Sequence, residues 1–316
     1  MSSALGIPGM KIGHYTDREG ISGCTVVLCE QGAIAGVDVS GSAPGTRETD
    51  LLHPGNLVEK VQAVVLSGGS AFGLDTAAGV MRYLEEREFG HETTAGRVPI
   101  VPAAIIYDLN IGNSSVRPGA GEGYEACLAA VDGEAIEGCV GAGTGAAVGK
   151  IFGMQRATKS GLGIVSQRVG GIVVAALVVV NAFGDVINPE SGEIIAGPRQ
   201  QGGFASTMDI LRRGEFGKEA MPFNTIIGVV ATDAYLNKEQ ANRLAQVARA
   251  GIAHTVNPCH TVYDGDVLFC LSLGKKKCDL MTLGAIAAEV VSAAIIRGVL
   301  QAESMGGIPA ARDVRR

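Results

Sequence analysis

The chain reads AMPFNTIIGVVATDA over residues 220–234, where a polar pair after a proline-containing loop opens an apolar, strand-like run. The pair is Asn224-Thr225. If the chain cut itself after Asn224, the hydroxyl of Thr225 would be the nucleophile and its own freed α-amine the base. An α-amine, with a pKa of about 8, can accept a proton at neutral pH, which an amide nitrogen cannot do. The alternative is a plain turn that leads into a strand.

Seven further blocks flank this junction. In chain order they are IGHYTD (12–17), GCTVV (23–27), GTRETD (45–50), LSGGSAFGLD (66–75), GAGTG (141–145), VNA (180–182) and DGD (264–266). Together with Asn224-Thr225 they resemble the DmpA-type aminopeptidases, the family of L-aminopeptidase/D-esterase and β-aminopeptidases, which has nylon-oligomer hydrolases as relatives. The resemblance covers most of the chain. It implies a self-cleaving hydrolase of the N-terminal-nucleophile type.

Composition is typical of a compact globular protein. The chain has 316 residues, of which 47% are hydrophobic and 18% charged, and its 46 glycines indicate tight turns and close backbone packing. We expect a single hydrolase domain over 1–316, cut into 1–224 and 225–316. The net charge of −6 disfavours nucleic acid as a partner.

Targeting and membrane signals are weak. Residues 1–10 lack a positive region followed by an apolar run, and the most apolar stretch, 172–180, is too short to span a bilayer. Seven cysteines without CxxC pairs indicate reduced thiols, so we expect a cytoplasmic protein that does not bind membranes.

Neither a cofactor nor a metal is expected. Cys259-His260 with nearby His254 suggests a metal site or a thiol nucleophile, but no further ligands are grouped with them. The segment GAGTGAAVGK (141–150) fails the phosphate-loop pattern, because Thr144 and Ile151 replace the required Gly and Ser/Thr. A glycine-rich turn near a site is the simpler interpretation.

The pattern of apolar residues predicts an α+β fold, and the resemblance sharpens this to an αββα sandwich. Strands are expected at 23–29, 34–39, 63–66, 163–167, 172–181, 225–232 and 267–273. Helices are expected at 71–86, after the N-cap Asn237 with Gln240 as its capping-box partner, and at 280–300. Residues 280–300 are nearly apolar all round, which predicts a helix covered on both sides. Residues 197–219 are polar and Gly-containing and predict an exposed linker.

Three residues are candidates for the charge and oxyanion chemistry. The resemblance places Lys150 in the active site, where its charge would stabilise an oxyanion or tune the amine; the alternative is a solvated lysine after a turn. Asn181 ends the most apolar run, and an Asn there is costly unless it is hydrogen-bonded. The resemblance makes it an oxyanion donor, whereas the alternative is the start of a turn. Tyr107 is either a second oxyanion donor, again by resemblance, or a core tyrosine with a wet hydroxyl.

Two further segments have competing interpretations. Ser70 lacks the second Gly of a GxSxG elbow and is expected to cap the following helix, although the N–H groups of its turn could line a pocket. Asp264-Gly265-Asp266 is either a turn or a carboxylate pair that holds an ammonium group. Nylon-oligomer relatives have this Asp pair, whereas β-aminopeptidases have Ser and Glu there and Ser as nucleophile, so β-peptide specificity is not implied.

The predicted function is hydrolysis of N-terminal amino-acid amide, peptide or ester bonds through an acyl-Thr225 ester. Thr225 would be the nucleophile, and the other five residues its supporting site: Tyr107, Lys150, Asn181, Asp264 and Asp266. An ω-amino-acid oligomer hydrolase and an acyl transferase of the ornithine acetyltransferase type share this chemistry. A catalytically inactive oligomeric binding protein of the same fold is the alternative from another class. The resemblance also implies tetramers or larger assemblies.

Overall fold

The computed structural model describes residues 5–133, 136–215 and 223–314. Its helices are α1 Thr76–Glu85, α2 Ala120–Leu128, α3 Thr207–Arg213, α4 Lys238–Ala248, α5 Ala250–Thr255, α6 Leu280–Leu300 and α7 Ala311–Val314. Its strands are β1 Lys11–Asp17, β2 Ser22–Val39, β3 Thr46–Arg47, β4 Lys60–Ser67, β5 His91–Thr93, β6 Gly96–Val98, β7 Ala103–Ile105, β8 Ala147–Val148, β9 Thr158–Lys159, β10 Leu162–Val169, β11 Ile172–Asn181, β12 Asp185–Ile187, β13 Ile194–Ala196, β14 Arg199–Gln200, β15 Gly203–Phe204, β16 Thr225–Ala234, β17 Val256–Asn257 and β18 Val267–Lys276.

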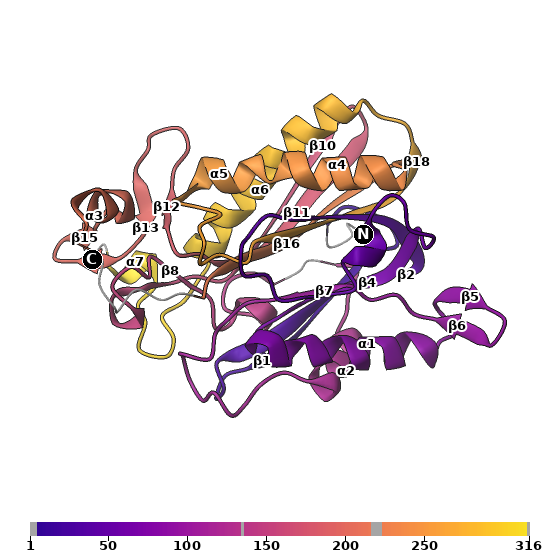
Figure 1. Ribbon diagram of the computed structural model, residues 1–316, viewed down its shortest axis with the longest axis horizontal. Helices are drawn as coiled ribbons and strands as arrows, with labels where there is room; N and C mark the ends of the chain where they lie inside the picture. Colours follow the sequence, from indigo (N-terminus) through magenta and orange to yellow (C-terminus); the bar gives the residue numbers. More distant parts are fainter. Residues whose placement is uncertain (1–4, 134–135, 216–222, 315–316) are drawn as a thin grey trace.

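Within the described residues, one nine-stranded sheet forms the centre of the molecule. Its strand order is β10-β11-β16-β18-β2-β4-β7-β3, with β1 paired to β2. In Figure 1, α4, α5 and α6 lie on one side of the strands and α1 and α2 on the other. The expected αββα arrangement is therefore confirmed, with both strand layers belonging to one folded sheet.

Three apolar clusters hold these layers together. The middle one lies between the two halves of the sheet and contains Val27 and Leu66 from one half and Leu177 and Phe269 from the other. Alternate residues of β11, such as Val178, point instead into the cluster under α4–α6. The third cluster joins β2 and β4 to α1 and α2. Because β11 is buried on both faces, its sequence is continuously apolar rather than alternating.

Strand β2 connects the two layers. It was expected as two strands, 23–29 and 34–39, but it runs unbroken from Ser22 to Val39. Its first part pairs with β1 and β4 and its last part with β18. Between them the register shifts at Leu28/Ala33, and Gly32 has a φ of +87°. This irregularity lets the strand bend and change layers, which explains why the sequence resembles a turn there.

The expected helices are present, with one change at the first. Residues Ser70–Asp75 form a 3₁₀ helix, and the α-helix α1 begins only at Thr76. Asn237 caps α4 as expected, since its side chain accepts from the Gln240 N–H at 2.8 Å while Gln240 reciprocates at 3.1 Å.

Helix α6 has the expected bounds but is not covered on both sides. It packs on β10 and β11 and against α4 and α5, whereas Met281 and Leu300 on its outer side are 81% and 53% exposed. Among the described helices, α6 has the length and composition to cross a membrane, yet most of it is buried in this core.

The expected linker at 197–219 contains structure over its described part. Strands β14 and β15 pair as a hairpin, and α3 follows with Ser206 as its N-cap and Gly214 closing it at a φ of +67°. Charged residues on a short surface helix resemble a loop in the sequence, which is why α3 was missed. Residues 216–222 lie outside the described residues.

Candidate active site

Thr225 and Asn181 are brought together at one edge of the central layer. They are the terminal residue pair of the antiparallel β11–β16 ladder. Both side chains are buried, with 4% and 1% exposure. The register of the ladder therefore places the predicted nucleophile directly beside the predicted amide donor.

The carbonyl oxygen of Asn224 is hydrogen-bonded from two sides. The hydroxyl of Thr225 donates to it at 2.5 Å, and the N–H of Gly265 donates to it at 2.8 Å. Asn224 also donates its own N–H to the Tyr263 carbonyl at 3.0 Å. The Asn224-Thr225 peptide bond is thus fixed in place, with a hydroxyl and a donor at its carbonyl group.

Lys150 is buried next to Asn181, so the solvated-lysine alternative does not hold. Its Nζ donates to the Asn181 side-chain oxygen at 2.6 Å and to the Asn181 carbonyl at 3.1 Å. Burial lowers the pKa of Lys150 to about 7, against an opposing effect of Asp264 and Asp108. Gly149 precedes it at a φ of +69°, and a Cβ there would lie 2.3 Å from the Gly197 backbone. The glycine-rich turn thus serves to place this lysine.

The two aspartates of Asp264-Gly265-Asp266 have different partners. Asp266 accepts the Ile226 N–H at 2.7 Å and faces His260 Nδ1 at 2.7 Å. Asp264 accepts the Thr261 N–H at 2.7 Å. Burial, together with the charge of Asp266, raises the pKa of Asp264. The pair belongs to the turn that leads into β18, and both carboxylates are buried. The Asp266 carboxylate contacts the residue after Thr225, whereas Asp264 meets the residue before it through a backbone bridge with Asn224.

Tyr107 and Ser70 line a small pocket of about 180 Å³ at Thr225, together with Pro44, Ile105 and Phe223. The Tyr107 hydroxyl donates to Asn110 at 3.4 Å, and it is the Tyr107 carbonyl that accepts from the Asn181 amide, at 3.2 Å. The Tyr107 ring lies 5.0 Å from that of Phe223. The predicted capping role of Ser70 is wrong, because Ser70 lies inside the 3₁₀ helix with a φ of +55° and the cap position is Gly69.

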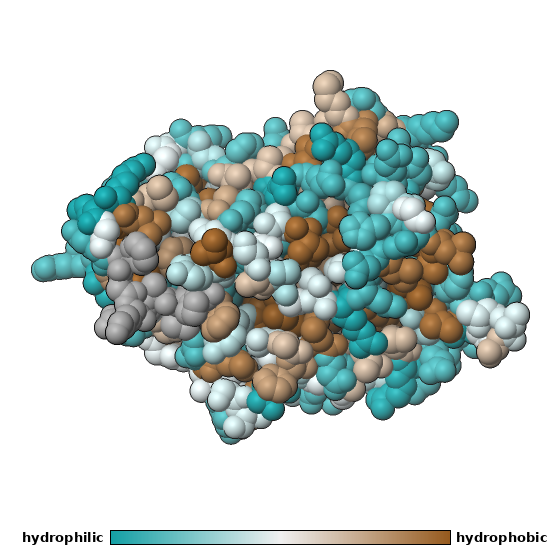
Figure 2. Space-filling view, viewed as in Figure 1, coloured by the Kyte–Doolittle hydropathy of each residue, from teal (hydrophilic) through white to brown (hydrophobic). Residues whose placement is uncertain are grey.

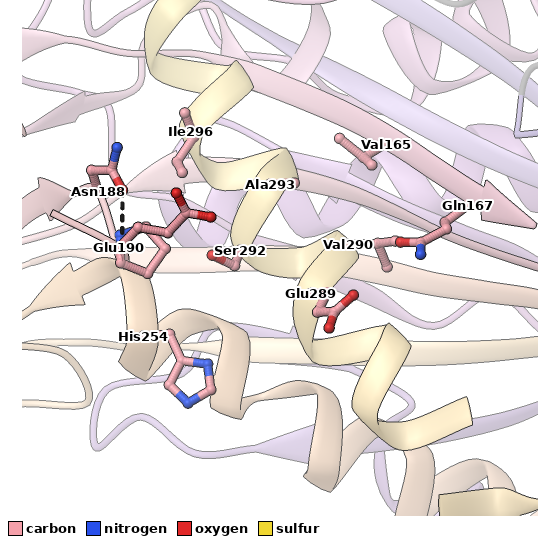
Figure 3. A pocket seen from close by; sticks show the side chains of 11 residues that line it. Val165, Gln167, Asn188, Glu190, His254, Glu289, Val290, Ser292, Ala293 and Ile296 are labelled. Atoms are coloured by element: carbon pink, nitrogen blue, oxygen red, sulfur yellow. Dashed lines mark hydrogen bonds between the residues drawn. The ribbon is translucent and has the colours of Figure 1, made fainter. Parts of the chain in front are cut away.

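A larger pocket, of about 790 Å³, lies elsewhere, between α6, α5 and the end of β10 (Figure 3). It is lined by Glu289, His254 and Glu190, while Ser292 is hydrogen-bonded to Thr255 at 2.5 Å. None of the predicted site residues lines it. Because an activated nucleophile needs a partner that can take its proton, the small pocket at Thr225 is the better candidate for catalysis.

Three nearby residues were not predicted from the sequence as parts of this site. Asp108 accepts from the Gly69 N–H at 2.7 Å and from the Ser22 hydroxyl at 2.8 Å, and burial raises its pKa to about 6. Gly265 supplies an N–H to the Asn224 carbonyl, and His260 bonds to Asp266. Asp108 follows Tyr107 directly in the chain, but nothing in its spacing indicates a contact with Ser22. His254 lines the larger pocket, so it does not join Cys259 and His260, and the described residues contain no metal-binding cluster.

A family comparison decides the identity of the protein. The model of "Peptidase family S58" matches residues 4–312. The chain belongs to peptidase family S58. This S58 peptidase is therefore a hydrolase of peptide or amide bonds, and the predicted resemblance to DmpA-type aminopeptidases is confirmed.

Individual relatives agree with this assignment. A Mycobacterium tuberculosis protein named "uncharacterized aminopeptidase" is 39% identical, and the match covers 99% of this chain and 98% of that protein. The 6-aminohexanoate-oligomer endohydrolase of Paenarthrobacter ureafaciens is 30% identical, with 92% and 83% covered. Among solved structures, the L-aminopeptidase D-Ala-esterase/amidase of Ochrobactrum anthropi, described as a variant of the Ntn hydrolase fold, has a TM-score of 0.73 at 22% identity, with 98% and 88% covered. A Burkholderia β-aminopeptidase has a TM-score of 0.71 at 22% identity, with 99% and 92% covered.

Proposed function

We propose that this S58 peptidase cuts itself between Asn224 and Thr225 and then works as an aminopeptidase with Thr225 as its N-terminal nucleophile. The observation that carries the proposal is the pair of contacts on the Asn224 carbonyl oxygen, from the Thr225 hydroxyl at 2.5 Å and from the Gly265 N–H at 2.8 Å. A nucleophile next to a carbonyl that is already polarised is the arrangement that acyl transfer needs.

Self-cleavage then follows in two steps. The Thr225 oxygen attacks the Asn224 carbonyl carbon, negative charge develops on the carbonyl oxygen, and the Gly265 N–H stabilises it. The bond from this carbon to the Thr225 nitrogen breaks, and that nitrogen gains a proton to become an α-amine. Water hydrolyses the resulting ester, which leaves a carboxylate on Asn224 and restores the hydroxyl of Thr225.

Turnover of a substrate repeats this chemistry between molecules. The freed α-amine takes the proton of the Thr225 hydroxyl, the hydroxyl attacks the substrate carbonyl, and the amine product leaves with a proton. Asn181 has a second amide N–H besides the one bonded to Tyr107, so it can donate to the oxyanion, with the Tyr107 hydroxyl as second donor. Water then hydrolyses the acyl-Thr225 ester.

The size of the pocket supports this order of events. At about 180 Å³ it is smaller than ordinary ligand sites of roughly 300–1000 Å³. Phe223 and Asn224 form part of its wall. Once the bond is cut, these two residues become a chain end that can withdraw, and the pocket can then admit a substrate.

The test is maturation. On a denaturing gel the protein should give fragments 1–224 and 225–316, and N-terminal sequencing should find Thr225. Thr225→Ala should remain one chain and lack activity, whereas Thr225→Ser, which keeps a hydroxyl, should still mature. A Thr225→Ala protein that hydrolyses amino-acid amides at near the wild-type rate would refute the scheme and direct attention to Ser70 in the same pocket.

Hydrolysis of ω-amino-acid oligomers is the second candidate. The observation that favours it is 30% identity to the 6-aminohexanoate-oligomer endohydrolase, together with the buried Asp264 and Asp266 beside Thr225. A panel of α-, β- and ω-amino-acid amides, assayed with and without an amine acceptor, distinguishes these substrates and also separates hydrolysis from acyl transfer.

A further inference from the structure

His260 has an unusual backbone conformation and contacts Asp266, which bonds to the residue after Thr225. Its φ of +51° lies in the left-handed region, which is uncommon for a side chain of this size. The imidazole is 21% exposed, while its partner Asp266 is 1% exposed. Non-glycine residues with such backbone angles tend to occur where the side-chain position matters. Here the conformation directs Nδ1 to within 2.7 Å of the Asp266 carboxylate.

Asp266 connects His260 to the backbone next to Thr225 through hydrogen bonds on both sides. One carboxylate oxygen faces His260, and the other accepts the N–H of Ile226 at 2.7 Å. Ile226 directly follows the nucleophile. The main-chain oxygen of Asp266 is held as well, by the N–H groups of Ser40 and Gly41 at 3.0 and 3.2 Å. The Asp266 carboxylate is thus held on both oxygens. Asp264 also accepts a hydrogen bond, from the Thr261 N–H at 2.7 Å, and its charge acts on Lys150.

A protonated His260 places a positive charge against the buried Asp266 carboxylate. Asp264 and Asp266 repel each other, and Lys150, whose pKa is lowered to about 7, offers only part of a charge at neutral pH. Burial lowers the pKa of His260, but its hydrogen bonds to Asp266 and Cys259 outweigh this and raise it to about 10. The other charged groups that face this cluster are Asp38, Arg243 and Arg249, which share a surface pocket with His260, and Asp108 and Lys159, which act on Lys150.

We propose that His260 is a positioning residue: its ring holds the Asp266 carboxylate aligned on the Ile226 N–H, which fixes Thr225 and leaves Asp264 as the carboxylate that serves the α-amine. The inference rests on the proposed function of Thr225. A role for His260 as the partner of a Cys259 nucleophile has less support. Its Nδ1 is directed at Asp266, and Cys259 does not line the pocket at Thr225, so a Cys259-His260 nucleophile would lie away from the cavity.

The experiment compares three variants with the wild-type chain. His260→Asn keeps a donor near the place of Nδ1 without the charge, His260→Ala removes both, and Cys259→Ser is the matched control. For each, the rate of maturation and the kcat and KM of the mature enzyme are measured from pH 5 to 9. Circular dichroism confirms folding.

The charge of Asp266 already raises the pKa of Asp264, so loss of the His260 cation beside Asp266 should make Asp264 harder to ionise. In His260→Asn we expect the acidic limb of maturation and of kcat to move up by about one pH unit, with KM nearly unchanged. His260→Ala should in addition lower both rates about 10²-fold, because the nucleophile loses its alignment. Cys259→Ser should behave as wild type.

Specific results would overturn the inference. A lower Tm with unchanged pH profiles would mean a purely structural role, and equal defects in Cys259→Ser would mean that His260 acts through the thiol. If neither His260 variant folds, NMR titration of the labelled wild-type chain decides, since a His260 that is neutral at pH 8 contradicts the proposal. If Thr225→Ala still matured and kept its activity, the proposed function itself would instead be refuted.

Discussion

Asn181 and Thr225 form the last residue pair of the β11–β16 ladder, and the Asn181 side chain also accepts the Lys150 ammonium proton at 2.6 Å. One amide thus links Thr225, the proposed nucleophile, to a buried lysine. Its oxygen is occupied by Lys150 and by the Ala147 N–H at 3.2 Å, so the NH₂ group must point the other way, to the Tyr107 carbonyl. Lys150 therefore fixes the orientation in which Asn181 can donate to an oxyanion.

Two substitutions of Asn181 separate these roles. Asn181→Ala should lower kcat about 10²–10³-fold with little change in KM, since the donor acts mainly in the transition state. It should also cost about 1–3 kcal/mol of stability, because buried Lys150 loses its side-chain acceptor and keeps only the Asn181 carbonyl. Asn181→Asp keeps an acceptor for Lys150 but no donor, so it should lose kcat while keeping its stability. Steady-state kinetics and urea unfolding measure both, and a fully active Asn181→Asp would exclude the donor role.

Lys150 should leave a signature in the pH dependence of stability. Its pKa is about 7 in the folded chain and about 10.4 when unfolded. Between these values the unfolded chain binds more protons at this group, so stability should rise with pH. Lys150→Met should reduce that rise in stability between pH 7 and 8. The control, Lys275→Met at an exposed lysine, should leave the rise unchanged. Urea unfolding is compared in a Thr225→Ala background, which keeps every chain uncut. Equal slopes in Lys150→Met and its parent would contradict the lowered pKa.

Assembly is the next prediction. Figure 2 shows hydrophobic residues in several separate groups on the surface of this face, among hydrophilic ones. Met281 and Leu300 at the two ends of α6 are 81% and 53% exposed, and burying such surface favours association. We expect light scattering of the mature protein to give at least four times the 32.3 kDa mass of one chain. A monomer at micromolar concentration would contradict this.

The elements were predictable from the sequence where one local signal determines them. The bounds of β11 and α6 follow from long apolar runs, and the cap of α4 from Asn237 and Gln240. Strand β2 was split because the bend at Gly32 resembles a turn, and pairing with β4 and β18 continues the strand beyond it. Tertiary contacts decide such cases, and a single sequence does not contain them.

The residues that form the site could be predicted from the sequence better than the contacts between them. Lys150 and Asn181 are 31 residues apart, and their 2.6 Å contact depends on how the 149–150 segment pairs with 183–184. His260 was considered with Cys259 and His254 for a metal or thiol site. Its actual partner, Asp266, is only six residues away, but the contact requires a left-handed backbone at His260 that nothing in the sequence indicates.

Asp264 provides the test of whether one site performs both reactions. Asp264→Asn keeps the shape of the side chain and its contact with the Thr261 N–H, found at 2.7 Å, but removes the charge that acts on Lys150 and that, in the proposed scheme, serves the α-amine of Thr225. In the proposed scheme, self-cleavage and turnover are both acyl transfers at the Thr225 hydroxyl, so both rates should fall together.

The pH dependence of both rates in the wild type should show the titration of Asp264. Burial and the charge of Asp266 raise the pKa of Asp264, so its carboxylate is lost as the pH falls through that raised value. Both rates should therefore decline on the acidic side in the wild type, and this decline should be weaker in Asp264→Asn. The control is Asp209→Asn on the surface, where the carboxylate only pairs with Arg212. A variant of Asp264 that matures slowly yet turns over normally would show that the two reactions rely on different groups, because a shared nucleophile supported by a shared carboxylate cannot lose one activity and keep the other.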